Sequence, residues 1–299
     1  MKKIILFLLF SNFIFSQEIP SENYFWEYNY NTENGVEALI GVKNCYIRQD
    51  ATSNSQLLDS LQIGNKIKIV KNTNENLNIK GLNLSWVEIE YYKNNQIKTG
   101  FLWKGFIAIN FAISDNLTFI TTVDRKFSKK IKQGDYEYDA DFYGLTIKVI
   151  NAKNDILTEK SFTKQFSESY FSYSSVIDNW GLKNLIKIYR LGVGGGACGV
   201  PTEYVYYGWT GAEFVTLPEK YDVGDAGAYY HTEEFIFPKE KGGQPDIIIK
   251  NITEAENTDD NSENYSFLVS KSVEYYSWDG KNFKLIKTKK LKPYIEKED

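Results

Sequence analysis

Residues 206–214 read YYGWTGAEF, and residues 275–283 read YYSWDGKNF. Both segments follow the pattern Tyr-Tyr-x-Trp-x-Gly-x-x-Phe, with Trp209 and Trp278 at the same place in each copy. An aromatic run favours a β-strand, and a Thr-Gly or Asp-Gly pair supplies the positive φ angles that tight hairpins need. Each copy therefore predicts a β-hairpin whose Phe lies on the inner face of the returning strand.

An apolar strand precedes each hairpin, LKNLIKIYR at residues 182–190 and PDIIIKNI at residues 245–252. A further hairpin is predicted in FYGLTIKVINAKNDILTEKSF, where the chain turns at Asn151 to Asp155. Repeated strand-loop-hairpin units are typical of β-propellers and of stacked antiparallel sheets. Because two clear copies are too few to close a propeller, we expect a curved sheet or a sandwich over residues 111–299.

The composition favours an all-β protein. Aromatic residues make up 16% of the 299 residues, with 22 Tyr and 19 Phe, and such side chains fit the half-buried surface of a sheet. The formal net charge is −4. Nucleic-acid phosphates attract basic surfaces, so we expect no nucleic-acid partner.

The N-terminal sequence MKKIILFLLFSNFIFSQEIP has the layout of a secretory signal peptide over residues 1–16. Lys2 and Lys3 form the positive region, a short apolar stretch follows, and Ser16 offers a small residue at the cleavage point. Residues 17–35 then form a polar and aromatic lead-in segment. No later segment approaches ~20 continuous apolar residues. The sequence therefore predicts an exported protein, periplasmic or secreted, without a membrane span in the mature chain.

Residues 36–110 show short strands separated by polar turns, the pattern of a small barrel. Ile67 and Ile69 alternate with lysines, and SWVEIEYY places Val87 and Ile89 on the face opposite Trp86. A polar loop is expected at residues 71–84.

Several spaced motifs in this region carry a resemblance. They are Cys45-x-Ile47-Arg48, Ser53 to Ser55, Leu61-x-x-Gly64, Trp86-Val87, Gly100-Phe101 and Gly105-Phe106-Ile107. In this order they resemble the bacterial SH3-like (SH3b) family, over about a quarter of the chain. The resemblance implies a small SH3-like barrel that recognises a peptide or a cell-wall component. The longer loop at residues 71–84 departs from the family pattern, so the ligand is not transferred.

Three aromatic side chains of this barrel are candidates for ligand contact, since flat rings offer contact area at low entropic cost. They are Tyr46, Trp86 and Trp103. The alternative is that the two tryptophans belong to the core, which is the commoner place for a large aromatic side chain.

The chain has two cysteines, Cys45 and Cys198. Export permits a disulfide between them, whereas the inward register of Cys45 favours a buried thiol. Cys198 lies in RLGVGGGACGVPTEY, residues 190–204. The spacing of the glycines fits neither a phosphate loop nor a dinucleotide fingerprint, so we expect a surface connector. Cys198 with His231, the only histidine, would be a nucleophile and its base, but the expected peptidase motif is absent.

Two acidic clusters occupy residues 135–141 and 256–263. Solvated turns are the expected interpretation, and calcium binding is the alternative. A carboxylate pair could also serve glycoside cleavage. We expect no other cofactor and no metal centre.

Together these features predict an exported, non-catalytic binding protein of the bacterial envelope. Its expected partner is a peptide, a peptidoglycan fragment or an envelope protein. The alternative function is hydrolysis of cell-wall peptides or glycans.

Overall fold

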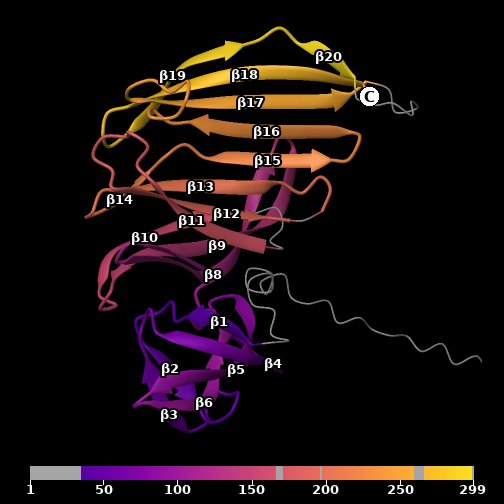
Figure 1. The fold of residues 1–299 in the computed structure, drawn as a ribbon. Coiled ribbons are helices and arrows are strands. Elements are labelled where there is room, and N and C mark those ends of the chain that lie inside the picture. Colours follow the sequence, from indigo (N-terminus) through magenta and orange to yellow (C-terminus); the bar gives the residue numbers. More distant parts are fainter. Residues whose placement is uncertain (1–34, 166–170, 196, 259–265, 298–299) are drawn as a thin grey trace, which may run out of the picture.

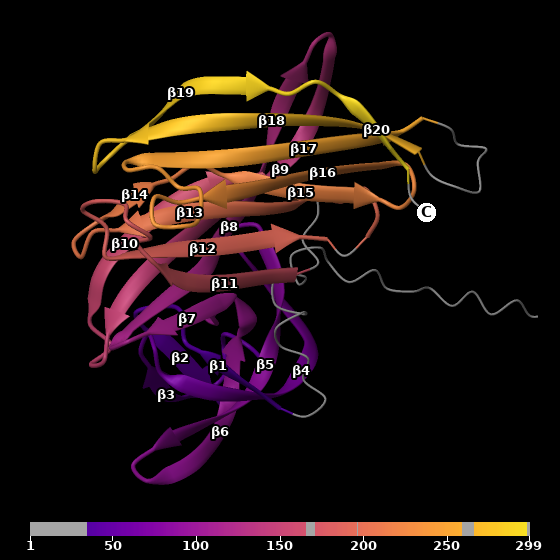
Figure 2. The same cartoon turned by 45° about the horizontal axis from the view of Figure 1, so that its top comes forward.

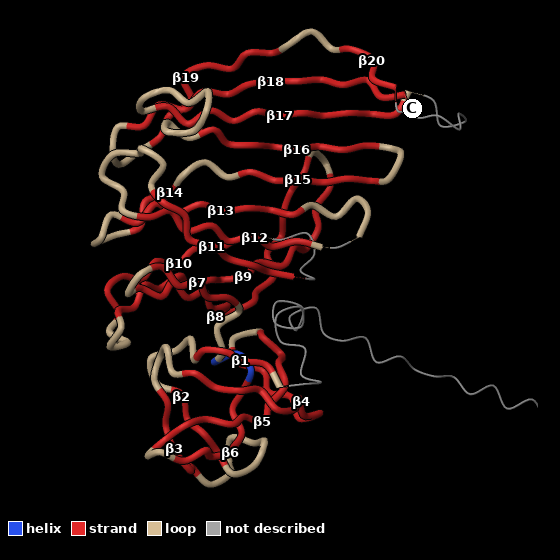
Figure 3. The backbone as a smooth tube through the Cα atoms, in the orientation of Figure 1, coloured by secondary structure: helices blue, strands red, loops and turns tan. Residues whose placement is uncertain are grey.

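The computed structural model describes residues 35–165, 171–195, 197–258 and 266–297 (Figure 1). The predicted signal peptide lies outside these residues, as does nearly all of the lead-in segment. Strands make up most of the described chain, and its only helical element is a single 3-10 turn at Lys104–Phe106 (Figure 3). The predicted all-β class is therefore confirmed. In the same residues, no helix is long and apolar enough to cross a membrane.

The first sheet has six strands in the order β1-β4-β5-β6-β2-β3. Its strands are β1 (Val36–Leu39), β2 (Cys45–Arg48), β3 (Leu57–Leu61), β4 (Lys66–Ile79), β5 (Leu82–Lys93) and β6 (Gln96–Trp103). Ile67, Ile69, Val87 and Ile89 are buried, as their alternation predicts. The sheet curls on itself (Figure 1). The resemblance of residues 36–110 to the SH3-like family stays a prediction.

The loop expected at residues 71–84 is instead the end of a long hairpin, because β4 and β5 continue through it. Lys80 and Gly81 both have positive φ angles, 52° and 83°, as a tight two-residue turn requires. Asn78 stabilises this turn by accepting a hydrogen bond from the Gly81 amide at 3.2 Å. The second half of β4 is mostly exposed and its side chains are polar, so its sequence resembles that of a loop although it forms a strand.

The second sheet has four strands in the order β10-β9-β8-β7. They are β7 (Asn110–Ser114), β8 (Leu117–Gln133), β9 (Tyr136–Asn151) and β10 (Ile156–Lys164). The turn predicted at Asn151 to Asp155 is confirmed, and the Asn151 side chain accepts hydrogen bonds from the amides of Lys153 and Asp155.

The third sheet has ten strands and is strongly curved (Figure 2). Its order is β11-β12-β13-β15-β16-β17-β18-β19, with β14 paired to β13 and β20 paired to β18. The strands are β11 (Phe171–Asp178), β12 (Lys187–Gly194), β13 (Thr202–Trp209), β14 (Phe214–Thr216), β15 (Lys220–Asp225), β16 (Tyr229–Ile236), β17 (Ile247–Asn257), β18 (Ser266–Trp278), β19 (Phe283–Lys290) and β20 (Tyr294–Lys297).

Both predicted hairpins form, in equivalent registers. Trp209 pairs with Phe214, and Trp278 pairs with Phe283. The glycines of the two turns, Gly211 and Gly280, have φ angles of 98° and 101°. The repeat read from the sequence is therefore a structural repeat within one antiparallel sheet.

A single large core joins the three sheets. At its centre Phe119 of β8 lies against Tyr189, Trp209 and Phe214 of the third sheet, with ring centroids 5.7, 5.9 and 6.3 Å away. The hydroxyls of Thr121 and Tyr189 are hydrogen bonded inside this contact. The second sheet thus supports the first half of the third.

Candidate functional site

Strand β15 forms a seam in the ten-stranded sheet. Its first half pairs with β13, from Thr202↔Asp222 to Tyr204↔Lys220, over three residue pairs. Its second half pairs with β16, also over three pairs, including Val223↔His231. Beyond these short ladders the neighbouring strands separate.

Side chains replace the ladder where β15 and β16 diverge. Lys220 donates to the backbone oxygen of Glu233 at 2.7 Å, and Asp222 accepts from the Glu233 amide at 2.9 Å. The same Lys220 ammonium also donates to Asp222 at 3.0 Å. Backbone groups that the sheet leaves unpaired are therefore satisfied by charged side chains.

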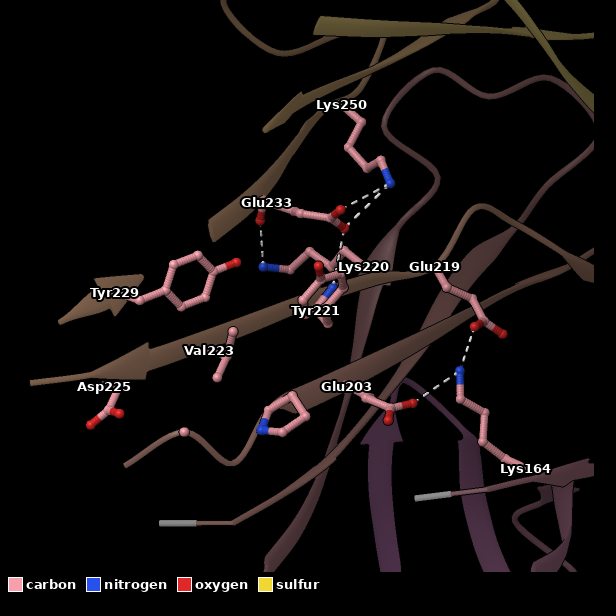
Figure 4. A pocket seen from close by; sticks show the side chains of 12 residues that line it. Lys164, Glu203, Glu219, Lys220, Tyr221, Val223, Asp225, Tyr229, Glu233 and Lys250 are labelled. Atoms are coloured by element: carbon pink, nitrogen blue, oxygen red, sulfur yellow. Dashed lines mark hydrogen bonds and ion pairs between the residues drawn. The ribbon is translucent and has the colours of Figure 1, made fainter. Parts of the chain in front are cut away.

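A pocket of about 650 Å³ opens at this seam, and we call it the seam pocket (Figure 4). It is lined by tyrosines, carboxylates, lysines and the end of the glycine-rich connector. The lining residues are Lys164, Gly199, Pro201, Glu203, Glu219, Lys220, Tyr221, Val223, Asp225, Tyr229, Glu233 and Lys250.

On one side of the pocket, Lys164 bridges two carboxylates. Its ammonium lies 3.2 Å from Glu203 and 2.5 Å from Glu219, and Figure 4 shows both carboxylates turned toward it. Burial alone would lower the pKa of Lys164, but the two carboxylates outweigh it and raise this pKa. Lys164 is therefore a fixed cation that two anions share.

On the other side, Glu233 is a buried carboxylate, with its side chain 5% exposed. It accepts hydrogen bonds from Lys250 at 3.2 and 3.3 Å and from the Tyr221 amide at 3.2 Å. Lys250 also lies 3.4 Å from Glu274 on β18. Here again two carboxylates share one ammonium.

His231 lies beneath the pocket wall and is 3% exposed. Its ring is stacked on Tyr221, which covers it from solvent, and its Nδ1 lies 3.1 Å from Glu254. Its Nε2 lies 3.2 Å from Glu233, but the angles do not make a hydrogen bond. His231 therefore supports the wall formed by Tyr221.

Two tyrosines give the pocket its aromatic surface. Tyr221 is 38% exposed, and Tyr229 is partly buried. Burial raises the pKa of both phenols, and the nearby carboxylate of Glu254 raises each of them further. Both rings stay neutral at physiological pH.

The glycine-rich connector forms the rim of the pocket. The Gly199 amide donates to the Gly224 oxygen of β15 at 2.8 Å, and Gly199 has a φ angle of 74°. Cys198 beside it is exposed. The expected connector is thus also a wall of the site.

No family model, curated protein or solved structure matches the chain.

The three aromatic residues predicted for ligand contact do not share a surface. Tyr46 is exposed on β2, whereas Trp86 and Trp103 are buried and lie opposite each other on β5 and β6. The Trp103 indole donates to the backbone oxygens of Leu77 and Leu84. The two tryptophans therefore have the alternative role, core packing, and both belong to the large hydrophobic cluster.

The two cysteines are both free thiols, so the structure has no disulfide between Cys45 and Cys198. Cys45 is buried in the first sheet, and burial raises its pKa to about 12. The interpretation of Cys45 as a buried thiol thus agrees with its position. His231 is bonded to Glu254 and stacked on Tyr221, and no interaction joins it to Cys198 in the described chain.

The acidic cluster at residues 135–141 lies at the tip of the β8–β9 hairpin. There Asp141 pairs with Lys126 at 2.9 Å, and Glu137 pairs with Lys130 at 2.9 Å. Most of the second cluster lies outside the described residues. Within the described ranges, no group of three or more His, Cys, Asp or Glu side chains could hold a metal ion.

The sequence did not point to the seam pocket. Its charged residues come from β10, β13, β15, β16, β17 and the β14–β15 connection, and each of them looks ordinary in its own segment. The one available signal was the alternation of Tyr229, His231 and Glu233, which places three polar groups on one face of β16.

Proposed function

We propose that this chain is a non-catalytic binding protein of the bacterial envelope, and that it holds a basic side chain of a peptide in the seam pocket. The observation that carries the proposal is the surplus of carboxylates over ammonium groups at the pocket. Three lysines line the pocket, Lys164, Lys220 and Lys250, and three glutamates line it with them, Glu203, Glu219 and Glu233. Two further carboxylates lie beside these lysines, Asp222 at Lys220 and Glu274 at Lys250, so negative charge exceeds positive charge around the pocket.

Asp225 adds to this surplus because it lines the pocket, is exposed, and has no ion pair in the described residues. The aromatic faces of Tyr221 and Tyr229 lie in the same pocket. An ammonium or guanidinium group is attracted both by carboxylates and by the faces of aromatic rings. These features support a cationic ligand group over an anionic one.

Hydrolysis of wall peptides or glycans, the alternative proposal, needs a carboxylate that delivers a proton or an activated nucleophile. Glu203, Glu219 and Glu233 are each held in ion pairs. Such pairing favours a fixed electrostatic role over proton transfer. It therefore supports binding as the preferred function.

Isothermal titration calorimetry with Ac-Ala-Lys-Ala-NH₂ and its neutral analogue Ac-Ala-Met-Ala-NH₂ tests the pocket. We expect the lysine peptide to bind more tightly, and Asp225→Asn to weaken it several-fold, because one partly exposed ion pair contributes up to about 1 kcal/mol. Asp135→Asn is the matched control, since Asp135 is an exposed aspartate of the β8–β9 turn that does not line the pocket, and it should change nothing. Equal binding of both peptides would overturn the proposal.

The envelope part of the proposal rests on the signal peptide predicted at residues 1–16 and on the SH3-like resemblance. A pull-down with purified sacculi and muropeptides tests it. Retention that is lost in excess lysine peptide would support a wall-directed role of the seam pocket. Absence of both retention and cleavage would exclude a wall component as the partner.

A further inference from the structure

The two Trp–Phe hairpins are followed by equivalent bent strands. In the first unit, β14 pairs with the end of β13, and after Pro218 the chain continues in the same direction as β15 and pairs with the start of β13. In the second unit, β19 pairs with the end of β18, and after Pro293 the chain continues as β20 along the start of β18. β20 therefore has the position in the second unit that β15 has in the first.

The outer edges of these two bent strands differ. β15 is covered by β16, which pairs antiparallel with its residues Val223 to Asp225. Within the described ranges, no strand pairs with the outer edge of β19 or β20 (Figures 1 and 2). An uncovered edge presents backbone donors and acceptors that another extended chain can pair with. The first unit shows that this position in the fold accepts such a strand.

The side chains of this edge are mainly basic and apolar, and Glu296 of β20 is its one carboxylate. Leu285, Ile286 and Ile295 are 45%, 55% and 55% exposed. No ion pair joins the lysines of this edge to a carboxylate within the described residues. These lysines are Lys281, Lys284, Lys287, Lys289, Lys290, Lys292 and Lys297. We call this surface the lysine edge, residues 281–297.

The charge of the lysine edge selects its occupant. A second copy would place one set of lysines against another, and such like charges oppose edge-to-edge pairing. An extended segment with alternating acidic and apolar side chains would neutralise the lysines and cover the exposed leucine and isoleucines. β16, the strand at the equivalent position, itself carries Glu233 and Glu234.

We propose that the lysine edge binds an acidic, extended segment of a partner protein by adding it as a β-strand antiparallel to β19 and β20. Backbone hydrogen bonds along the edge supply affinity, and lysine–carboxylate pairs select the acidic partner. This surface is separate from the seam pocket, since none of its residues lines that pocket.

Fluorescence anisotropy with two labelled peptides tests the proposal. The first is Glu-Val-Glu-Val-Glu-Val-Glu, and the second is Glu-Pro-Glu-Pro-Glu-Pro-Glu, which has the same charge but cannot form a ladder. We expect the valine peptide to bind at least tenfold more tightly than the proline peptide. Equal binding of the two peptides, or no binding of either, would overturn strand addition.

Charge reversal locates the site. The triple variant Lys284→Glu, Lys287→Glu, Lys289→Glu should reduce affinity for the valine peptide by roughly tenfold or more, because each side chain changes from attraction to repulsion. The control changes three exposed lysines to Glu, Lys129 and Lys132 of β8 and Lys153 of the β9–β10 turn. An equal loss in both triple variants would show a general charge effect and overturn the lysine edge as the site. Circular dichroism confirms that both variants fold.

Discussion

The ring of His231 lies parallel to the ring of Tyr221, with centroids 4.1 Å apart and planes inclined by 4°. One ring is buried and the other forms a wall of the seam pocket. The backbone amide of the same Tyr221 donates to Glu233, the buried carboxylate that also lies beside His231. The pocket wall and the buried charges beneath it are therefore one structural unit.

Replacing Glu233 by Gln should destabilise the protein by about 3 kcal/mol, because it leaves the largely buried Lys250 with a weaker set of partners. Glu234→Gln is the matched control, since the neighbouring Glu234 is exposed, and it should change stability by less than ~0.5 kcal/mol. Urea denaturation followed by tyrosine and tryptophan fluorescence measures both. A similar effect of the two substitutions would show that the ion pairs of Glu233 do not contribute to stability.

The two repeated tryptophans should respond differently to Phe. Both are buried, but the Trp278 indole donates to the Lys183 oxygen at 3.0 Å, whereas the Trp209 indole nitrogen has no hydrogen-bond partner among the described residues. Trp278→Phe should therefore cost about 1–2 kcal/mol more than Trp209→Phe, which removes an unsatisfied donor. Thermal and urea denaturation of the two single variants give this difference directly. A larger loss of stability for Trp209→Phe than for Trp278→Phe would contradict the assignment of the indole hydrogen bond to Trp278 alone.

The two thiols should differ in reactivity. Thiolate is the reactive form, and the raised pKa of Cys45, about 12, keeps it protonated at pH 8. Iodoacetamide should modify Cys198 alone in the native protein and both cysteines in denaturant, as counted by mass spectrometry. Cys198→Ser is the control and should leave no reactive thiol in the native state. Rapid modification of two sites would contradict the burial of Cys45.

The same thiol makes stability depend on alkaline pH. Its pKa rises from 9.0 in the unfolded chain to about 12 when folded, so the folded state holds the proton more tightly. Its contribution is complete below pH 9 and decreases as the pH rises from 9 toward 12, with a slope of up to ~1.4 kcal/mol per pH unit. Cys45→Ala should reduce this slope relative to the unchanged protein.

Local sequence patterns predicted much of the fold. Alternation placed Val87 and Ile89 inside, and the paired Trp-x-Gly motifs predicted both hairpins in their observed registers. The same alternation placed Trp86 on the outer face of β5, where the structure buries it. A period of two assigns a face but does not reveal whether that face is covered, and here both Trp86 and its neighbour Val87 are buried.

The seam pocket could not be predicted in this way because it depends on long-range pairing. Lys164 and Glu219 lie 55 positions apart in the chain, and only the packing of β10 beside the β14–β15 bend brings them together. The sequence predicts a connector for the glycines near Cys198, and such a prediction says only which two strands they join. Their contact with Gly224, and hence their place at the rim, depends on where β15 lies.

The seam strand also has a consequence for folding cooperativity. A ladder of three residue pairs on either side of β15 is the shortest connection along this sheet, apart from the small β14 hairpin. Segments joined by few hydrogen bonds open locally at lower free energy than the rest of a domain. A buried hydrophobic cluster, with Tyr206 and Leu217 from one half of the sheet and Ile248 and Trp278 from the other, therefore supplies much of the connection that the ladders lack. A ligand in the seam pocket would bind across the same junction and couple the opening of one half to that of the other.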